Sequence, residues 1–454
     1  MKTATAIHSD KQPRRALVVG LGRTGLSCAR WLAGQGWQVA VTDSREEPPA
    51  LAELRRILPD VGLFLGSFAS EAFEHADLMV VSPGVPLSTP QVRAAQERGV
   101  PAVGDVELFA QTVNRPVAAI TGSNGKSTVT TLLGMMAREA GLRTAVGGNL
   151  GEPVLDLLEK EAELYVVELS SFQLETTESL SPAVAVVLNV SADHMDRYPS
   201  LEAYAETKAR IYRQAEVGIC NLDDPRVAAM PRAGETLFFT LGEPESDETF
   251  GVREFDGESW LCRGTRPLLP ARELRMPGLH NRANALAALA MGTALNLPPE
   301  AMTAALRAFP GLPHRTEHVA TLAGVEWYND SKGTNPGATI AALEGLASEA
   351  GRTVLIAGGQ GKGADFSELA PAVKAHARAL VLLGEDADRI AAALEGTVPM
   401  VKVADMTEAV ARAAELARPG DRVLLSPACA SFDLFRGFEH RGEVFRRCVE
   451  GLRP

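Results

Sequence analysis

The sequence has few cysteines and no long apolar segment. Its five cysteines are odd in number and lack the spacing of metal ligands, which argues against a disulfide scaffold or a cysteine metal site. They are Cys28, Cys220, Cys262, Cys429 and Cys448. No run of about 18 apolar residues is present to span a membrane, and the N-terminus lacks the apolar core of a signal peptide. We therefore expect a cytoplasmic protein with reduced thiols and no membrane association.

The sequence also lacks an excess of positive charge. Lysine and arginine together number 45 against 57 aspartates and glutamates, so the formal net charge is −12. This balance argues against a general nucleic-acid-binding surface, although local basic side chains can still bind small anions. Hydrophobic residues make up 46% of the 454 residues, which is ordinary for a globular protein, and the length predicts about three domains.

One glycine-rich segment, residues 121–128, reads Thr-Gly-Ser-Asn-Gly-Lys-Ser-Thr. Apolar residues before it predict a buried strand, and the residues after it have helical spacing. Such a turn presents backbone N–H groups to phosphate, while the Lys126 ammonium reaches the terminal phosphates and the Ser127 hydroxyl can hold Mg²⁺. Because Ile120 stands where the strict phosphate-loop pattern has glycine, this is a shortened variant beginning at Gly122. It predicts binding of ATP or GTP; an ordinary structural turn is the alternative.

The first third contains a second turn of the phosphate-binding type. An apolar strand from Ala16 runs into Gly20-x-Gly22-x-x-Gly25, and a second strand, residues 38–42, ends in Asp43. The pattern predicts a Rossmann-like domain whose helix N-terminus binds a pyrophosphate. A single fingerprint does not identify the nucleotide, so NAD and other nucleotide diphosphates remain open. The later turn at 82–84, Ser-Pro-Gly, is either a ligand contact or a structural turn.

Polar residues follow predicted parallel strands in the middle third. Glu168 ends one strand, and Asp193 and His194 follow another. Because the carboxyl ends of parallel strands open on one edge of a sheet, we expect these side chains to converge near the phosphates. Carboxylates suit Mg²⁺, and an imidazole is a tolerable ligand. Each residue alone could instead be a cap, and for Asp196 both interpretations stay open.

Other polar residues of the middle third have no chemistry that spacing alone reveals. Lys208 lies on a predicted helix, where a solvent-exposed lysine is the default interpretation. Residues 232–275 contain several short β-like runs with acidic loops. Asn281 and Asn284 share one face of a predicted helix, where they either bond an adenine or cap the turn.

The last third begins after a Pro/Gly-punctuated boundary at 309–313 and predicts a second Rossmann-like unit. Its strand ends present lysines and hydroxyl groups in the segments 327–335, 353–362 and 426–433. Lysines paired with hydroxyls suit a carboxylate substrate. A solvated lysine is the alternative for each one alone.

Six separated motifs resemble those of the Mur ligase family over essentially the whole chain. They lie at 121–128, 168–175, 189–197, 311–315, 329–335 and 426–433. The segments 168–175 and 426–433 favour the members that add D-glutamate to UDP-N-acetylmuramoyl-L-alanine in peptidoglycan precursor synthesis. The resemblance implies an α/β fold of three domains. These are a Rossmann-like UDP-substrate domain at 1–104, a central P-loop-type ATP/Mg-binding domain with a mostly parallel sheet at 105–311, and a Rossmann-like D-glutamate-binding domain at 312–454.

The resemblance also implies ligand-binding residues. For the UDP substrate they are Arg23, Thr24, Asp43, Ser44, Ser82, Pro83, Gly84 and Asn149, where Ser44 departs from the family's threonine. For ATP they are Gly122, Ser123, Asn124, Gly125, Lys126, Ser127, Thr128, Asn281, Asn284, Arg315 and Asp330. For D-glutamate they are His194, Thr334, Lys362, Ser431 and Phe438.

Two Mg²⁺ ions complete the implied site. The matching metal positions are Ser127, Glu168, His194 and Lys208, the last as a carbamate formed with CO₂. The resemblance thus changes the interpretation of Lys208 from a surface residue to a site residue. Lys126, Glu168, His194 and Lys208 are the implied catalytic residues.

The implied reaction activates a carboxylate, which is a poor acyl donor. ATP phosphorylates the L-alanyl carboxylate, and the amino group of D-glutamate then attacks the acyl phosphate, while Mg²⁺ and Lys126 offset the charge on the phosphoryl group. We expect domain closure about hinges near Gly104 and Leu312, because the nucleotide and amino-acid residues lie on different domains. These substrates are small molecules, and we expect a monomer that binds no nucleic acid.

Two other functions are compatible with parts of the sequence. An NAD-dependent oxidoreductase built on the turn at 20–25 would leave the Gly-Lys-Ser segment and Glu168 unexplained. A non-enzymatic ATP switch would bind nucleotide without substrate-dependent turnover. Sibling ligases, which add L-alanine, a diamino acid or a glutamate on folate, are closer alternatives, but folate-type ligases lack a UDP-binding first third.

Overall fold

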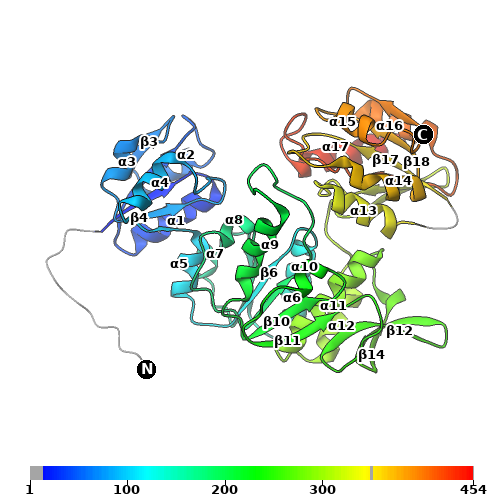
Figure 1. The fold of residues 1–454 in the computed structure, drawn as a ribbon, viewed down its shortest axis with the longest axis horizontal. Coiled ribbons are helices and arrows are strands. Elements are labelled where there is room, and N and C mark those ends of the chain that lie inside the picture. Colours follow the sequence, from blue (N-terminus) through cyan, green and yellow to red (C-terminus); the bar gives the residue numbers. More distant parts are fainter. Residues whose placement is uncertain (1–13, 348–350, 453–454) are drawn as a thin grey trace. The chain divides into compact units, whose positions relative to one another are not determined.

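The computed structural model describes residues 14–347 and 351–452. The described chain falls into two compact units, the first formed by residues up to 119 together with 143–182, and the second by residues 120–142 and 183–454. Every sheet is covered by helices, and the α/β class predicted from the sequence is confirmed (Figure 1). The predicted domain limits at 104 and 311 stay a prediction.

The first unit opens with a five-stranded sheet in the order β3-β2-β1-β4-β5, in which all pairs are parallel. Its strands are β1 (Arg15–Val19), β2 (Gln38–Asp43), β3 (Gly62–Leu65), β4 (Leu78–Val81) and β5 (Ala102–Val103). Its helices are α1 (Arg23–Gly34), α2 (Leu51–Ile57), α3 (Ser70–Glu74) and α4 (Pro90–Glu97). Central strand β1 has a run of buried apolar side chains, as expected for a strand covered on both faces.

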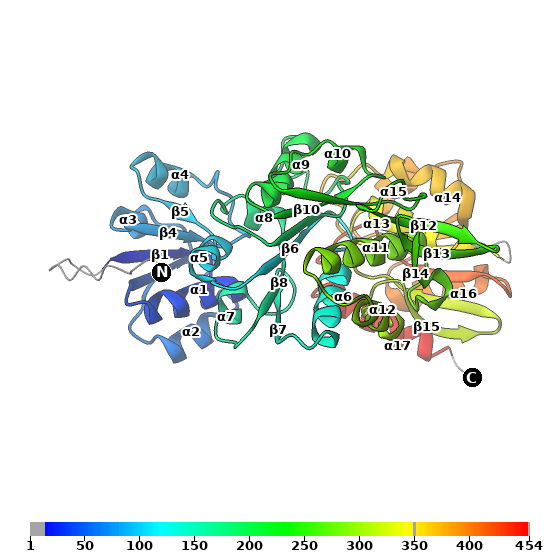
Figure 2. The same ribbon diagram turned by 90° about the horizontal axis from the view of Figure 1, so that it is seen from below.

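The middle of the chain contributes a nine-stranded sheet in the order β14-β13-β12-β11-β10-β9-β6-β8-β7. Its strands are β6 (Val117–Thr121), β7 (Thr144–Gly148), β8 (Leu164–Glu168), β9 (Val184–Val187), β10 (Val217–Asn221), β11 (Glu235–Phe239), β12 (Thr249–Phe255), β13 (Glu258–Arg263) and β14 (Arg266–Pro270). The β-like runs predicted at 232–275 are therefore real strands. They end in the antiparallel pairs β12–β13 and β13–β14, and β14 is the edge strand beside the β12–β13 hairpin (Figure 2).

Helices of this middle region divide between the two units. The first unit contains α5 (Asp105–Thr112), α7 (Val154–Leu157) and α8 (Ser171–Leu174). The second contains α6 (Lys126–Glu139), α9 (Leu201–Ala209), η1 (Arg210–Tyr212), α10 (Pro225–Ala228), η2 (Ala271–Glu273), α11 (Leu279–Ala294) and α12 (Pro299–Ala308). Helix α6 begins at Lys126, within the glycine-rich segment and directly after Gly125.

The last third forms a six-stranded sheet in the order β15-β16-β20-β17-β18-β19, parallel except for the β15–β16 pair. Its strands are β15 (Glu317–Leu322), β16 (Val325–Asn329), β17 (Thr353–Ala357), β18 (Ala377–Leu382), β19 (Met400–Lys402) and β20 (Arg422–Leu425). Its helices are α13 (Pro336–Gly345), η3 (Phe366–Leu369), α14 (Ala370–His376), α15 (Ala387–Ala393), α16 (Met406–Leu416) and α17 (Phe438–Glu450).

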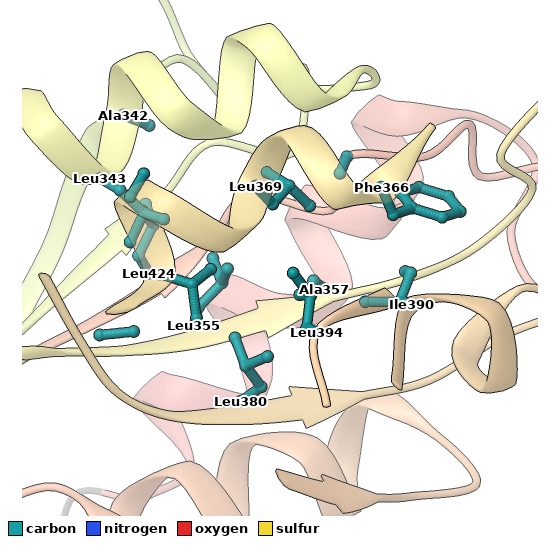
Figure 3. Packing of buried hydrophobic residues seen from close by; sticks show 14 of the residues in the cluster. Ala342, Leu343, Leu355, Ala357, Phe366, Leu369, Leu380, Ile390, Leu394 and Leu424 are labelled. Atoms are coloured by element: carbon teal, nitrogen blue, oxygen red, sulfur yellow. The ribbon is translucent and has the colours of Figure 1, made fainter. Parts of the chain in front are cut away.

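Side chains of this sheet alternate between two apolar cores. Leu355 and Leu380 pack on the face covered by α13 and α14, whereas Ile356 and Val381 pack on the opposite face with α16 and α17. Figure 3 shows Leu355 and Leu380 on the first of these faces, below Leu369. The alternation follows from the two-residue period of a strand, and it makes both faces of the sheet depend on the same strands.

Replacing Leu380 with alanine should destabilise this domain by about 2–5 kcal/mol, because it leaves a cavity in a core where the wild-type side chain is fully buried. Chemical denaturation followed by circular dichroism measures the change. The matched control is Leu434→Ala, whose side chain is already 46% exposed. Equal destabilisation by both variants would contradict this account of the core.

Candidate active site

The glycine-rich segment forms a tight turn between β6 and α6. Gly122 and Gly125 have φ angles of 153° and 84°, and the φ of Gly125 lies in the left-handed region that favours glycine. A Cβ atom on Gly125 would lie 2.4 Å from the Asn284 side-chain oxygen. Glycine is thus required both by the turn and by its close approach to helix α11.

Two lysine ammonium groups bind the same backbone carbonyl of this turn. Lys126 Nζ donates to the Gly122 carbonyl at 2.8 Å and to the Ser123 carbonyl at 2.9 Å. Lys208 Nζ donates to the Gly122 carbonyl at 2.9 Å and lies 4.5 Å from the Tyr204 ring centroid. Lys208 is 1% exposed. The default interpretation of a solvated Lys208 is therefore wrong, because helix α9 turns this side chain inward against the phosphate loop.

The loop lies at the edge of a cavity of about 320 Å³ within the second unit. Seven predicted ATP residues line it: Asn124, Gly125, Thr128, Asn281, Asn284, Arg315 and Asp330. The other four predicted residues, Gly122, Ser123, Lys126 and Ser127, belong to the same turn. The volume of the cavity lies in the range of small-molecule sites, and the Asn284 amide borders the phosphate loop at Gly125.

Residues of the last third also reach this loop. Arg315 Nη2 donates to the Ser127 hydroxyl at 2.8 Å. Asp330 accepts from the Ser426 hydroxyl at 2.7 Å and from the Thr316 N–H at 3.0 Å. Burial raises the pKa of Asp330 from 3.8 to about 6, although these hydrogen bonds oppose the shift. Asp330 is thus a buried carboxyl at the cavity wall.

His194 lies in an unusual backbone conformation for a residue other than glycine, with φ of 58°. Its N–H donates to Asp193 at 2.9 Å. Burial lowers the pKa of His194; the Asp193 charge opposes this, and the charges of Lys362, Lys126 and Lys208 lower it further. A neutral imidazole among cationic groups is suited to bind a metal ion.

Glu168 is buried at the end of β8 in the first unit. One oxygen accepts from the Asn149 amide at 2.7 Å, and the other, Oε2, has no hydrogen-bond partner in the described chain. A buried carboxylate oxygen without a partner fits a bound cation. The predicted convergence of Glu168 with His194, which belongs to the second unit, stays a prediction. Within residues 14–347 and 351–452, no group of three or more His, Cys, Asp and Glu side chains could hold a metal ion alone.

A second cavity, of about 450 Å³, lies within the first unit. All eight residues predicted for the UDP substrate line it: Arg23, Thr24, Asp43, Ser44, Ser82, Pro83, Gly84 and Asn149. Among the other lining residues, which were not assigned to this substrate from the sequence, are Arg45, Phe68 and Gln173. The turn at 20–25, the strand end at 43 and the turn at 82–84 thus meet at one edge of the sheet, as the parallel topology predicts.

Asp43 shapes the first of these turns. Its carboxylate accepts from the Leu21 N–H at 2.7 Å and from the Arg45 guanidinium at 2.7 and 2.8 Å. Burial disfavours the charged form, but the hydrogen bonds from Arg45 and Leu21 outweigh it, so the pKa of Asp43 lies below its ordinary value. Asp43 therefore holds the turn and Arg45 in place with both of its oxygens.

Four of the five residues predicted for D-glutamate belong to the last third of the chain, and the fifth, His194, follows β9. Lys362 has φ of 50°, Ser431 is buried, and Thr334 lies in the loop before α13. Phe438 begins α17, with its ring centroid 3.9 Å from Lys332 Nζ. The charge of Lys362 acts on His194, which places this lysine near the metal-type residues of the second unit.

Comparison with known proteins agrees with this geometry. Residues 14–104 match the Mur ligase MurD-like N-terminal domain, residues 120–292 the Mur ligase middle domain, and residues 314–429 the Mur ligase glutamate ligase domain. This chain belongs to the Mur ligase family. The family models cover both glycine-rich turns, at 20–25 and at 121–128. The alternative hypothesis of an NAD-dependent oxidoreductase therefore has no support.

Curated relatives of this Mur ligase extend over its whole length. A protein of Nitrosococcus oceani is 56% identical over 451 residues, covering 98% of this chain and 99% of its own length. One of Marinobacter nauticus is 54% identical over 441 residues, covering 97% and 98%. Both are named UDP-N-acetylmuramoylalanine–D-glutamate ligase.

Solved structures share the fold of this Mur ligase at low sequence identity. UDP-N-acetylmuramate-alanine ligase from Thermotoga maritima matches with a TM-score of 0.61 and 18% identity, covering 96% of this chain and 99% of its own. MurF from Acinetobacter baumannii matches with a TM-score of 0.60 and 19% identity, covering 96% and 90%. These matches show the fold alone.

The Mur ligase contains a buried cation that the sequence interpretation missed. Arg441 is 1% exposed and donates to the Ser331 hydroxyl and carbonyl and to the carbonyls of Cys429 and Ala430. Burial lowers its pKa to about 10. Arg441 thereby joins the motifs at 329–335 and 426–433. The available signal was its place on the face of α17 that also carries Phe445 and Val449.

No described helix of the Mur ligase has the length and apolar character needed to cross a bilayer.

Replacing Gly25 with alanine should lower the affinity for a UDP-linked ligand at least about tenfold and reduce stability, because the new Cβ would lie 2.0 Å from the Gly20 carbonyl oxygen. Calorimetric titration and thermal denaturation measure the two effects. Gly34→Ala, on the same helix, is the control and should be neutral, because no atom lies within 4 Å of the place its Cβ would take. Unchanged binding by Gly25→Ala would contradict the role given to this turn.

Replacing Asp330 with asparagine should remove a pH-dependent contribution to stability. The folded state holds the Asp330 proton more tightly than the unfolded state, so its contribution is present below about pH 4 and is lost as the pH rises through about 6. The stability of Asp330→Asn relative to wild type should therefore rise over this window, by up to about 3 kcal/mol. Urea denaturation between about pH 4 and about pH 6 measures the difference in stability, and the control is Asp388→Asn, whose side chain is 85% exposed. A stability difference between Asp330→Asn and wild type that does not change with pH would contradict this account.

Proposed function

We propose that this Mur ligase joins D-glutamate to UDP-N-acetylmuramoyl-L-alanine at the expense of ATP, in peptidoglycan precursor synthesis. The observation that carries the proposal is the identity of 56% and 54% to full-length relatives that bear this enzyme name. The two cavities support it, because one is lined by the residues predicted for the UDP substrate and the other by most of those predicted for ATP.

The first chemical step is transfer of the γ-phosphoryl group of ATP to the L-alanyl carboxylate. The bond between the β,γ-bridging oxygen and the γ-phosphorus breaks, a bond from a carboxylate oxygen to that phosphorus forms, and ADP leaves. When ATP is bound, the Lys126 ammonium leaves the carbonyls of Gly122 and Ser123 and binds phosphate oxygens instead. The Arg315 guanidinium likewise leaves the Ser127 hydroxyl and binds a phosphate oxygen. These cations offset the charge of the transferring group.

The second step forms the amide. The D-glutamate nitrogen attacks the acyl carbon, the nitrogen loses a proton, and phosphate leaves with the former carboxylate oxygen. Lys362, Thr334, Ser431 and Phe438 hold D-glutamate, and the lysine ammonium pairs with a carboxylate of that substrate. Closure about Gly104 and Leu312 would bring the reactants together.

Residues that would hold Mg²⁺ are Ser127, Glu168, His194 and Lys208. The unpartnered Glu168 Oε2 and the lowered pKa of His194 fit this role. When bound, Mg²⁺ supplies charge neutralisation at the phosphates. Carbamylation of Lys208 by CO₂ would replace one of two cations at the Gly122 carbonyl with an anion, which would favour two metal ions rather than one.

The proposed enzyme acts on small molecules only, as a monomer. Because the reaction consumes ATP and a UDP-linked precursor, we place it in the cytoplasm.

Phosphate release from ATP tests the function directly. The assay contains Mg²⁺ and UDP-N-acetylmuramoyl-L-alanine, and it compares D-glutamate with L-glutamate, L-alanine and a diamino acid. Release that needs both the UDP substrate and D-glutamate supports the proposal. Turnover with another amino acid would assign the chain to a sibling ligase, and nucleotide binding without any release would favour an ATP switch.

Replacing Lys126 with alanine should lower this turnover at least about 100-fold, because the ammonium is the cation that the phosphate loop presents to the transferring phosphoryl group. Steady-state phosphate release measures the loss. Lys374→Ala, on the exposed side of α14, is the control and should retain wild-type activity. Substantial activity in Lys126→Ala would contradict the phosphate-loop assignment.

A further inference from the structure

Helix α13 approaches the ATP cavity through small residues. A Cβ atom on Gly337, in the first turn of α13, would lie 2.9 Å from Ser191 Oγ and 3.1 Å from Ser191 Cβ. At the other end, a Cβ on Gly345 would lie 3.2 Å from the Cα of Gly278, at the start of α11. Gly337 also lines the cavity. The helix therefore packs so closely that its position sets part of the cavity wall.

Asn335 begins this helix and has two separate sets of hydrogen bonds. As the N-cap of α13, its side-chain oxygen accepts from the Ala338 N–H at 2.9 Å. The same side chain forms a reciprocal amide pair with Asn124, at 3.2 and 3.4 Å, and donates to Asp193 at 3.2 Å. Capping needs only the first set. The second set reaches across 211 residues of sequence to the phosphate loop.

The partners of Asn335 lie beside residues that the reaction uses. Asn124 stands within the phosphate loop, two residues before Lys126. Asp193 accepts from the N–H of His194. Thr334, predicted to contact D-glutamate, is the residue directly before Asn335. One buried amide, only 4% exposed, thus connects the amino-acid loop with the phosphate loop and with the segment that carries His194.

We propose that Asn335 is a positioning residue of the ligation reaction. Its amide pair with Asn124 and its bond to Asp193 fix the loop 330–335 and helix α13 against the phosphate loop, so that the amino group of D-glutamate lies within reach of the acyl carbon. This inference rests on the proposed function. It adds that the alignment depends on one side chain that touches neither substrate.

The test separates the capping role from the bridging role with Asn335→Asp. Aspartate caps a helix as well as asparagine does, but it has no N–H to donate and places a carboxylate opposite Asp193. We expect kcat/KM for D-glutamate to fall about 10- to 100-fold, with a higher KM for D-glutamate and a lower kcat. Asn335→Ala, which loses both roles, should show a loss of similar size and a lower melting temperature. Affinity for the UDP substrate, whose predicted residues belong to the first unit, should not change.

A second variant displaces the same helix through Gly337. Gly337→Ala forces the contact with Ser191 apart, so its turnover should fall, and its melting temperature should not exceed that of wild type. Glu344→Ala, at an exposed position of α13, is the control and should retain wild-type kinetics.

Wild-type turnover with D-glutamate is the reference, and its failure would refute the proposed function before any variant is compared. Given that turnover, wild-type kinetics for Asn335→Asp would overturn the inference, because a cap alone would then suffice. An equal loss of affinity for the UDP substrate would overturn it too, because the effect would then be a general loss of structure. Loss confined to kcat and to the KM for D-glutamate supports it.

Discussion

Two positively charged groups share one carbonyl oxygen in the phosphate loop. Lys126 and Lys208 both donate to the Gly122 carbonyl, and the charges of both, together with that of Lys362, disfavour protonation of His194. Like charges brought this close repel one another unless anions are present to balance them. The phosphate loop is therefore arranged for a highly charged ligand, and its lysines are held on backbone oxygens from which phosphate can displace them.

Glycine is what allows this arrangement to fit. A side chain at Gly125 would collide with Asn284, and one at Gly122 would lie 3.0 Å from the Cβ of Leu188. The loop is thus held between α11 and the end of β9, and its carbonyls point where the lysines can reach them. The same close packing recurs at α13, where Gly337 and Gly345 let a helix of the last third reach the nucleotide cavity.

Much of this could be predicted from the sequence, because glycine-rich turns and apolar strands are local signals. The phosphate loop, Asp43 and the turn at 82–84 were located in this way, whereas Arg23, Thr24, Ser44 and Asn149 were singled out by the family resemblance. Burial is different. Spacing alone predicted a solvent-exposed Lys208, yet α9 buries Tyr204 and Lys208, which lie four residues apart on one face. The aromatic partner was a usable signal that the lysine faces inward.

Long-range side-chain bonds could not be predicted at all. Asn335 has the sequence position of an ordinary N-cap, and Arg441 shares a helix face with Phe445 and Val449, which indicates burial but not its partners. Asn335 pairs with Asn124, 211 residues away, and Arg441 with Ser331, 110 residues away. The sequence around each residue contains no signal that identifies such a distant partner. Their contacts become visible only when the fold brings the segments together, so even the motif at 329–335, which contains Asn335, does not show what this residue binds.

The chain order of the two compact units has a consequence for biosynthesis. The first unit needs residues 143–182, and the segment 120–142, which carries the phosphate loop, belongs to the second. A ribosome therefore releases the loop while the first unit is still incomplete, and the UDP-type cavity closes with Gln173 well before the nucleotide cavity obtains Arg315 and Asp330. In the nascent protein the site for the precursor is complete before the site that would use ATP.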